Sequence, residues 1–258
     1  GREALRKSKK NKERTDIPRV EMNELDAEYR SHTRLEEVNL GLTKEQAMQE
    51  AQRCLDCPNP TCMQGCPVSI NIPTFVKNIE RGEFLEAARV LKETSALPAV
   101  CGRVCPQEKQ CESKCIHLKM GKPAVAIGYL ERFAADYERE SGNISIPEVA
   151  EKNGIKIAVV GSGPAGLSFA GDMAKRGYDV TVFEALHEIG GVLKYGIPEF
   201  RLPNKIVDVE IEGLRKMGVK FMTNCIVGKT ISYDDLHADG FKGIFAASGA
   251  GLPNFMNI

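Results

Sequence analysis

Cysteines are the residues of this sequence best suited to chemistry, because eight of the nine fall between Cys54 and Cys115. They form two blocks, Cys54-x2-Cys57-x4-Cys62-x3-Cys66-Pro67 and Cys101-x3-Cys105-Pro106-x4-Cys111-x3-Cys115. Thiolates are soft anionic donors for iron, and a two-residue spacing lets one loop place two sulfurs on one cluster. In two-cluster bacterial ferredoxins, the cysteine that precedes a proline ligates the other cluster. The Cys66-Pro67 step therefore predicts that the two blocks interleave.

Zinc is the main alternative, since a lone Cys-x2-Cys pair binds zinc as often as iron. The clustering of eight cysteines and the two Cys-Pro steps favour iron–sulfur clusters. Disulfides rank third, because no export signal opens the sequence. Cys225 stands apart from both blocks, and we predict that it is a packed thiol.

A glycine-rich turn at 161–166, Gly-Ser-Gly-Pro-Ala-Gly, is the second chemical signature. Its first glycine permits a tight bend, the second lets the backbone approach a pyrophosphate, and the third allows helix–strand packing. The N-terminus of the following helix favours an anion. Glu184, at the end of the next predicted strand, is placed to accept a hydrogen bond from a ribose 2′-hydroxyl. The motif fits NAD and FAD equally.

Two kinds of segment must position these residues. Helical periodicity predicts a helix that begins at Thr43, with a capping box to Gln46, and further helices at 74–81, 84–93 and 124–139. After Gly154 the pattern changes to α/β, with strands at 155–160, 180–183, 219–222 and 243–247 and a helix at 164–176. We therefore expect a helical domain over 1–140, a linker at 141–154 and a Rossmann-like domain over 155–258.

Composition narrows the class of protein. The 258 residues are 42% hydrophobic and 27% charged, which excludes a mainly disordered chain. The formal net charge is zero, which argues against nucleic-acid binding, and no apolar run is long enough to span a membrane. Residues 1–20 carry eight Lys and Arg, and we expect a solvated, partly mobile basic arm there. A cytoplasmic location is expected.

Several motifs then carry a resemblance to a known family. They are Arg53-Cys54-Leu55-Asp56-Cys57, Cys66-Pro67, Ile72-Pro73, Leu97-Pro98, Gly102-Arg103-Val104-Cys105-Pro106, Cys111-Glu112 and, after Glu184, Gly190-Gly191-Val192-Leu193 with the segment 194–203. From about Leu25 onward the sequence resembles the small-subunit family of bacterial glutamate synthase. The same module opens dihydropyrimidine dehydrogenase and the large subunit of NADH-dependent ferredoxin:NADP oxidoreductase. The resemblance implies an α-helical ferredoxin-like iron–sulfur domain followed by a Rossmann-like FAD-binding domain.

The resemblance also implies the site residues. One [4Fe–4S] cluster would be held by Cys54, Cys57, Cys62 and Cys115, and a second by Cys66, Cys105, Cys111 and Glu131. Cys101 falls outside this ligand set, and we predict that it is a packed thiol. The implied FAD contacts are Val104, Gly161, Gly163, Pro164, Ala165, Gly166, Leu167, Glu184, Gly191, Val192, Arg201 and Val227. The alternatives are that Glu131 is an ordinary surface residue and that Arg201 forms a surface ion pair. No catalytic acid or base is expected, because the cofactors carry the chemistry.

The function that the resemblance implies is electron entry. NAD(P)H would reduce FAD, and two clusters would pass single electrons to a glutamate synthase large subunit or another electron-accepting subunit. A ferredoxin:NADP or sulfide-type oxidoreductase and a non-enzymatic, zinc-stapled interaction module are the alternatives. A homo-oligomer is also open, whereas neither nucleic acid nor a membrane is an expected partner.

The family continues beyond the segment that matches 249–258 into an NAD(P)H domain. We therefore expect a C-terminally incomplete FAD domain, no NAD(P)H domain, weak or absent FAD and no activity for this sequence by itself.

Overall fold

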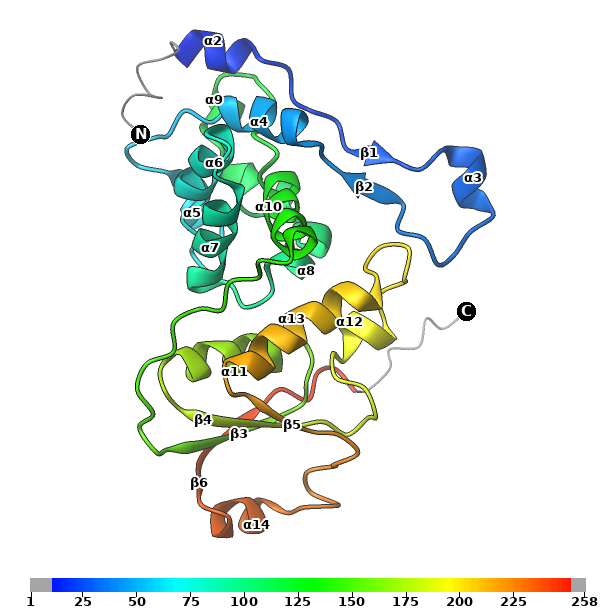
Figure 1. Cartoon of the computed structure of the whole chain (residues 1–258), viewed down its shortest axis with the longest axis vertical. Coiled ribbons are helices and arrows are strands. Elements are labelled where there is room, and N and C mark those ends of the chain that lie inside the picture. The colour runs from blue at the N-terminus through cyan, green and yellow to red at the C-terminus, as the bar shows by residue number, and fades with distance from the viewer. Residues whose placement is uncertain (1–10, 252–258) are drawn as a thin grey trace. The chain divides into compact units, whose positions relative to one another are not determined.

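The computed structural model of the chain describes residues 11–251 and divides into two units (Figure 1). Among these residues, 11–145 and 199–206 form the helical unit, and 146–198 and 207–251 form the sheet unit. The first half of the predicted basic arm, residues 1–10, lies outside the described residues. Within residues 11–251, no helix has the length and apolar character that crossing a bilayer requires.

Short helices make up most of the helical unit. They are α2 (Asn11–Asp16), α3 (Ala27–Ser31), α4 (Lys44–Gln52), α5 (Thr61–Gln64), α6 (Ile72–Glu80), α7 (Phe84–Thr94), α8 (Pro98–Val104), the 3₁₀ turns η1 (Gln107–Lys109) and η2 (Glu112–Lys114), α9 (Ile116–Lys119) and α10 (Ile127–Ser141). A small antiparallel sheet of β1 (Asn23–Glu24) and β2 (Asn39–Gly41) joins them. The capping box at Thr43 and Gln46 is confirmed, and it starts α4 one residue after Thr43.

The core of this unit lies between α4, α6, α7 and α10. Phe75, Ile79, Leu91 and Leu130 are fully buried there, as the helical periodicity of the sequence requires. The helix α10 ends at Gly142, which adopts the left-handed conformation that often closes a helix. Cysteines from the intervening loops pack against this core, so the helices fix the positions of the loops that carry them.

The expectation of a solvated, mobile arm is wrong for residues 11–20. Arg14 is 2% exposed, and its Nη1 donates to Glu80 Oε1 at 2.9 Å. Arg19 pairs with Glu112, with Nη2 and Oε2 2.9 Å apart. Glu80 and Glu112 are buried carboxylates, and a buried carboxylate is costly unless a cation and hydrogen bonds compensate it. Arg14 and Arg19 therefore dock this segment onto the helical unit, whereas Lys12 is exposed.

A four-stranded parallel sheet organises the sheet unit. Its elements are β3 (Lys156–Val160), α11 (Pro164–Lys175), β4 (Asp179–Phe183), α12 (Val192–Tyr195), α13 (Asn204–Lys216, whose first three residues group with the helical unit), β5 (Lys220–Met222), α14 (Tyr233–Ala238) and β6 (Phe241–Ala246). These strands confirm the predicted α/β pattern within one or two residues at most of their ends.

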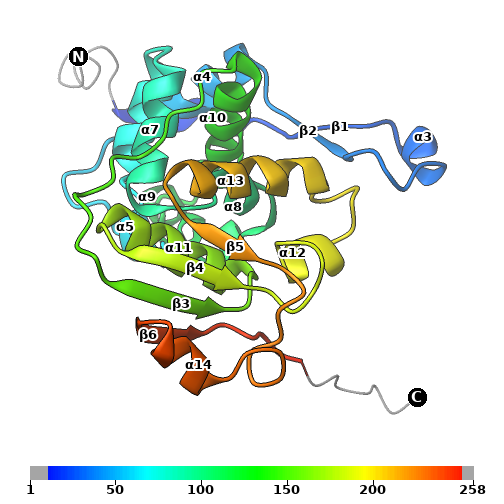
Figure 2. The same cartoon turned by 60° about the horizontal axis from the view of Figure 1, so that its bottom comes forward.

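The strand order is β5-β4-β3-β6, with all neighbours parallel (Figure 2). Starting from β3, the chain therefore builds β4 and β5 on one side and β6 on the other. In open parallel sheets, ligands bind beyond the carboxyl ends of the strands at such a switch point. Here Ala247 N donates to Val160 O at 2.8 Å, so the segments that follow β3 and β6 leave this edge side by side.

Candidate cluster and dinucleotide sites

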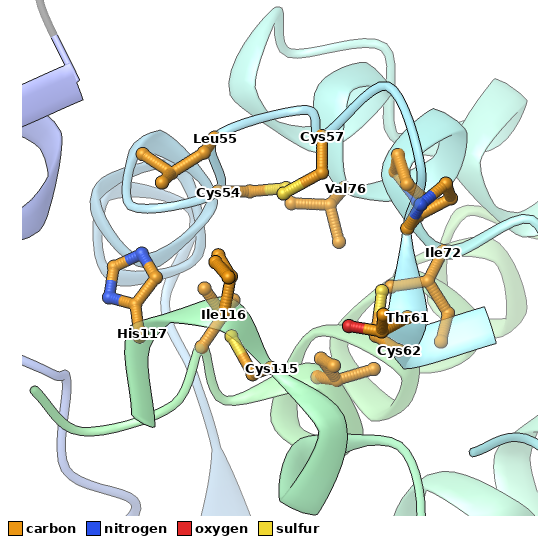
Figure 3. Close-up of a pocket in the computed structure, with 14 residues that line it drawn as sticks. Cys54, Leu55, Cys57, Thr61, Cys62, Ile72, Val76, Cys115, Ile116 and His117 are labelled. Atoms are coloured by element: carbon orange, nitrogen blue, oxygen red, sulfur yellow. The ribbon is translucent and has the colours of Figure 1, made fainter. Parts of the chain in front are cut away.

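Four cysteines from three segments of the helical unit line one pocket. We call Cys54, Cys57, Cys62 and Cys115 the Cys54 set. The first two lie on the loop after α4, Cys62 lies in α5, and Cys115 directly precedes α9. Figure 3 shows their sulfur atoms spaced around an open centre rather than meeting at one point. The remaining walls are largely hydrocarbon, from residues that include Ile72, Pro73, Val76, Val125 and Ile127.

The pocket disfavours uncompensated thiolates. Burial raises the pKa of Cys54 to about 11 and that of Cys62 to about 12. The neighbouring charges of Cys54 and Cys115 add to the rise at Cys62. Thiolates in such a pocket need positive charge from a bound group, because a buried anion without a counter-charge is unstable. Four soft donors around an apolar pocket therefore fit an iron–sulfur cluster, whose ferric and ferrous ions supply that charge.

A buried polar framework holds the loop that carries Cys54. The Arg53 side chain is fully buried, and its Nη1 donates to Glu50 Oε1 at 2.5 Å and to Ala124 O at 2.9 Å. His117 Nε2 lies 3.0 Å from Arg53 O, so this nitrogen carries the proton because a carbonyl can only accept. Lys77 Nζ donates to Cys54 O at 2.5 Å. Sequence reasoning missed Lys77 and His117.

The second predicted ligand group also lies in the helical unit. We call Cys66, Cys105, Cys111 and Glu131 the Cys66 set. Burial raises the pKa of Cys105 to about 11, and the nearby charges of Glu131 and Cys66 raise it further. The pKa of Cys111 is also raised, first by burial and then by Glu112, Glu131, Cys66 and Cys105. Cys105 and Cys111 therefore each lie within electrostatic reach of Cys66 and Glu131.

Glu131 is not the surface residue of the alternative interpretation. It is 6% exposed and lies on α10 beside fully buried Leu130. A carboxylate on this helix is a harder donor than thiolate, so a mixed set of three thiols and one carboxylate differs chemically from the Cys54 set. Cys105 Sγ donates to Gln110 Oε1 at 2.8 Å, and this hydrogen bond competes with ligation of a cluster by Cys105.

Two further observations concern the thiols. None of the nine cysteines forms a disulfide within residues 11–251, and no three His, Cys, Asp or Glu side chains in that range could hold a single metal ion. Cys225 is a packed thiol as predicted, buried against Phe183, Leu236 and Phe241. Cys101, on α8, is only half-buried, so its predicted packing is incomplete.

The glycine-rich turn of the sheet unit connects β3 to α11. Gly163 is the N-cap of α11, and Pro164 opens the helix. At Gly166 a Cβ atom would lie 2.0 Å from Gly161 O, so any side chain there would push the helix away from the strand. At Gly163, by contrast, nothing in the described chain lies within 4 Å of that position. This backbone is therefore open to a ligand at the helix N-terminus.

Glu184 and the Gly190–Gly191 turn complete this site. Glu184 is 6% exposed at the end of β4, where its Oε2 accepts hydrogen bonds from Ser162 N at 2.9 Å and from Ser162 Oγ. Ser162 Oγ in turn accepts from Gly190 N at 3.0 Å. A Cβ at Gly191, whose φ is +53°, would lie 2.8 Å from Gly163 Cα. Ser162 thus joins the glycine turn, Glu184 and the Gly190–Gly191 turn, and sequence reasoning did not select it.

The remaining predicted FAD residues divide between the units. Val192 directly follows Gly191, and its side chain is exposed. Val227 lies in the segment after β5, in which Cys225 N donates to Glu184 O at 2.9 Å. Val104 ends α8 and exposed Arg201 lies in the segment 199–206, so both belong to the helical unit. Their contacts with FAD stay predictions.

Comparison with known proteins follows the same division. Residues 30–143 match the family described as dihydropyrimidine dehydrogenase domain II, 4Fe-4S cluster, and residues 159–218 match an NAD(P)-binding Rossmann-like domain. The NAD-dependent dihydropyrimidine dehydrogenase subunit PreT of Escherichia coli O157:H7 is 39% identical over 224 residues, which cover 86% of this chain and 54% of PreT.

Glutamate synthase small chains are also similar, over a somewhat smaller part of this chain. The NADPH-dependent small chain of Escherichia coli K12 is 39% identical over 205 residues, covering 79% of this chain and 43% of its own length. That of Azospirillum brasilense is 35% identical over 200 residues, covering 78% and 42%. The chain thus spans about half the length of the curated relatives it matches.

Proposed function

We propose that the chain, which is similar to the glutamate synthase small chains and PreT subunits, is the electron-entry part of an NAD(P)H-dependent flavin and iron–sulfur oxidoreductase. When bound, FAD would accept electrons from NAD(P)H, and two [4Fe–4S] clusters would carry them singly to a partner subunit. The observation that carries the proposal is the Cys54 set, four thiols from three segments spaced around one pocket.

Each of the two ligand sets would hold one cluster. The Cys54 set would hold one with four thiolates, and the Cys66 set would hold the other with three thiolates and the Glu131 carboxylate. Their spacing supports clusters over a zinc staple, since a single zinc ion needs all four sulfurs at about 2.3 Å from one point. The hydrocarbon walls around the Cys54 set would keep water away, which influences the reduction potential.

The sheet unit would hold the dinucleotide part of FAD. Backbone N–H groups at the start of α11 face the open space beside Gly163 and would bind the pyrophosphate. The Glu184 carboxylate retains acceptor capacity for a ribose hydroxyl while Ser162 fixes its orientation. A carboxylate at this position disfavours a 2′-phosphate on the bound nucleotide.

Two partners follow from the relatives. A glutamate synthase large subunit would use the electrons to make glutamate, and the small chains support this candidate. A pyrimidine-reducing subunit is the second candidate. The PreT match supports it, because that match covers 86% of the chain against 79% for the Escherichia coli small chain.

Metal analysis of the full-length protein, purified without oxygen, tests the proposal. We expect about eight iron atoms and eight acid-labile sulfides per chain. Cys57→Ser should lose about half of the iron, whereas Cys225→Ser should keep all of it, because Cys225 is a buried thiol outside both sets. Stoichiometric zinc without sulfide would contradict the electron-entry function and favour the interaction module.

A further inference from the structure

A buried ion triad lies directly behind the loop that carries Cys54. Lys77, on α6, is 1% exposed, and its Nζ lies 2.5 Å from Glu80 Oε2 and 2.5 Å from Cys54 O. The second oxygen of Glu80 accepts from Arg14 Nη1 at 2.9 Å. Two cations thus share one carboxylate, and the triad of Arg14, Lys77 and Glu80 carries a net charge of about +1.

Geometry places the Lys77 charge beside a residue of the Cys54 set. The ammonium group of Lys77 donates to the backbone carbonyl of Cys54. Asp56, buried on the same loop, is a carboxylate that lines one pocket together with Lys77 and Arg14. Removing the Lys77 charge would therefore make this side of the Cys54 set more negative, whatever Asp56 contributes.

The Cys66 set has different charged neighbours. One of its members, Glu131, is itself a carboxylate, and Glu112, next to Cys111 in the chain, is a buried carboxylate that pairs with Arg19 at 2.9 Å. A buried ion pair by itself seldom adds stability over well-packed apolar residues. The burial of Lys77 with Glu80 behind the Cys54 loop therefore suggests a functional role.

We propose that Lys77, held in place by Glu80 and Arg14, is a positioning residue that raises the reduction potential of the cluster bound by the Cys54 set. This inference rests on the proposed function. Adding one electron to a cluster adds one negative charge, and a fixed cation nearby stabilises the reduced form more than the oxidised form. The low-polarity surroundings strengthen this effect.

Redox titration of the full-length protein, followed by electron paramagnetic resonance, tests the role of Lys77. The signal that disappears in Cys57→Ser identifies the Cys54 set. In Lys77→Gln we expect the ratio of reduced to oxidised cluster at a fixed potential to fall at least tenfold, which equals 59 mV for one electron. Lys77→Arg keeps the charge and should stay within threefold of wild type.

Lys92→Gln is the matched control. Lys92 is a half-buried lysine of the same unit, but its Nζ pairs with Glu138 and donates to Ser145 O. It should leave the potential of the Cys54 set unchanged. An unmoved potential in Lys77→Gln with full iron content, or an equal shift in Lys92→Gln, would overturn the inference.

Arg14→Gln tests the same inference if the Lys77→Gln protein does not bind the cluster of the Cys54 set. This change removes one cation of the triad from the separate helix α2, and we expect at least a threefold fall in the same ratio. An unchanged ratio would overturn the role of the triad. Wild-type protein that holds no iron and sulfide would instead overturn the proposed function. Eight iron atoms with an unmoved potential would overturn only the role of Lys77.

Discussion

Replacing Ser162 by alanine removes one hydroxyl that joins three parts of the dinucleotide site. The Ser162 Oγ atom donates to Glu184 Oε2 and accepts from Gly190 N at 3.0 Å. Ser162 itself is fully buried. In Ser162→Ala, the Gly190 N–H and one acceptor position of Glu184 would each lose a partner in a place that water does not reach.

The size of the effect follows from these two losses. A hydrogen bond to a charged group contributes about 1.5–3 kcal/mol, and a buried donor left without an acceptor costs about 1–3 kcal/mol. The two contributions share one hydroxyl and do not add fully. We therefore expect the free energy of unfolding of the sheet unit to fall by about 3 kcal/mol, which is a factor of roughly 150 in the unfolding equilibrium.

Hydrogen exchange measures this change at the site itself. The Gly190 amide, which donates to Ser162 Oγ, should exchange at least tenfold faster in Ser162→Ala. The control is Ser168→Ala on α11, a half-buried serine, which should change the free energy of unfolding by less than about 0.5 kcal/mol. Unchanged Gly190 exchange together with an unchanged free energy of unfolding would refute the linking role of Ser162.

Three further predictions concern the two sites. Gly191→Ala should reduce the FAD retained by the full-length protein more than tenfold, because the added Cβ would lie 2.8 Å from Gly163 Cα. Flavin absorbance after gel filtration measures this retention. The control Gly213→Ala, on α13 with open space around it, should keep the flavin. Burial raises the folded pKa of Cys54 to about 11 and of Cys62 to about 12 from about 9. Cluster-free protein should therefore be most stable below pH 9 and lose stability up to about pH 12 in urea titrations, and the double change of both residues to serine should flatten this dependence. The Cys54 set should be reduced at a higher potential than the Cys66 set, and loss of the higher-potential resonance in Cys111→Ser would contradict this order.

Short sequence patterns predicted most of the helices and strands, because the caps and periodicity that define them involve residues only a few positions apart. Thr43 and Gln46 start α4 through contacts only three residues apart. The helix α6 begins at Ile72, two residues earlier than expected, because the Asn71 side chain accepts from Thr74 N. Both caps can be read from the sequence, although the second was overlooked.

The start of α10 depends on distant residues instead. The helix begins at Ile127 rather than at 124 because the preceding backbone is already engaged. Arg53 donates to Pro123 O and Ala124 O, and Ala126 N donates to Glu50 Oε1 at 2.7 Å. The helical periodicity of residues 124–139 carries no information about these distant hydrogen-bond partners.

The same reason explains the missed site residues. The Cys66-Pro67 step predicted that the two cysteine blocks interleave, and the family resemblance implied the two ligand sets. Neither could predict the burial of Arg14, which depends on Glu80 far along the chain. Lys77 lies next to Val76 on the buried face of α6, and a lysine at such a position is the signal that could have been noticed. Ser162 lies between two fingerprint glycines, and its role depends on Glu184 and Gly190.

The pocket of the Cys54 set has a consequence for biosynthesis. One wall comes from the loop at 54–62 and another from Cys115 and α9, while Cys66, Cys105 and Cys111 lie between them in the chain. As the polypeptide leaves the ribosome, the early thiols have no fourth companion until Cys115 has been translated. In the proposed function, insertion of iron and sulfide at the Cys54 set would therefore wait until Cys115 has been translated, and a nascent chain stalled before that point would expose reactive thiols to oxidation.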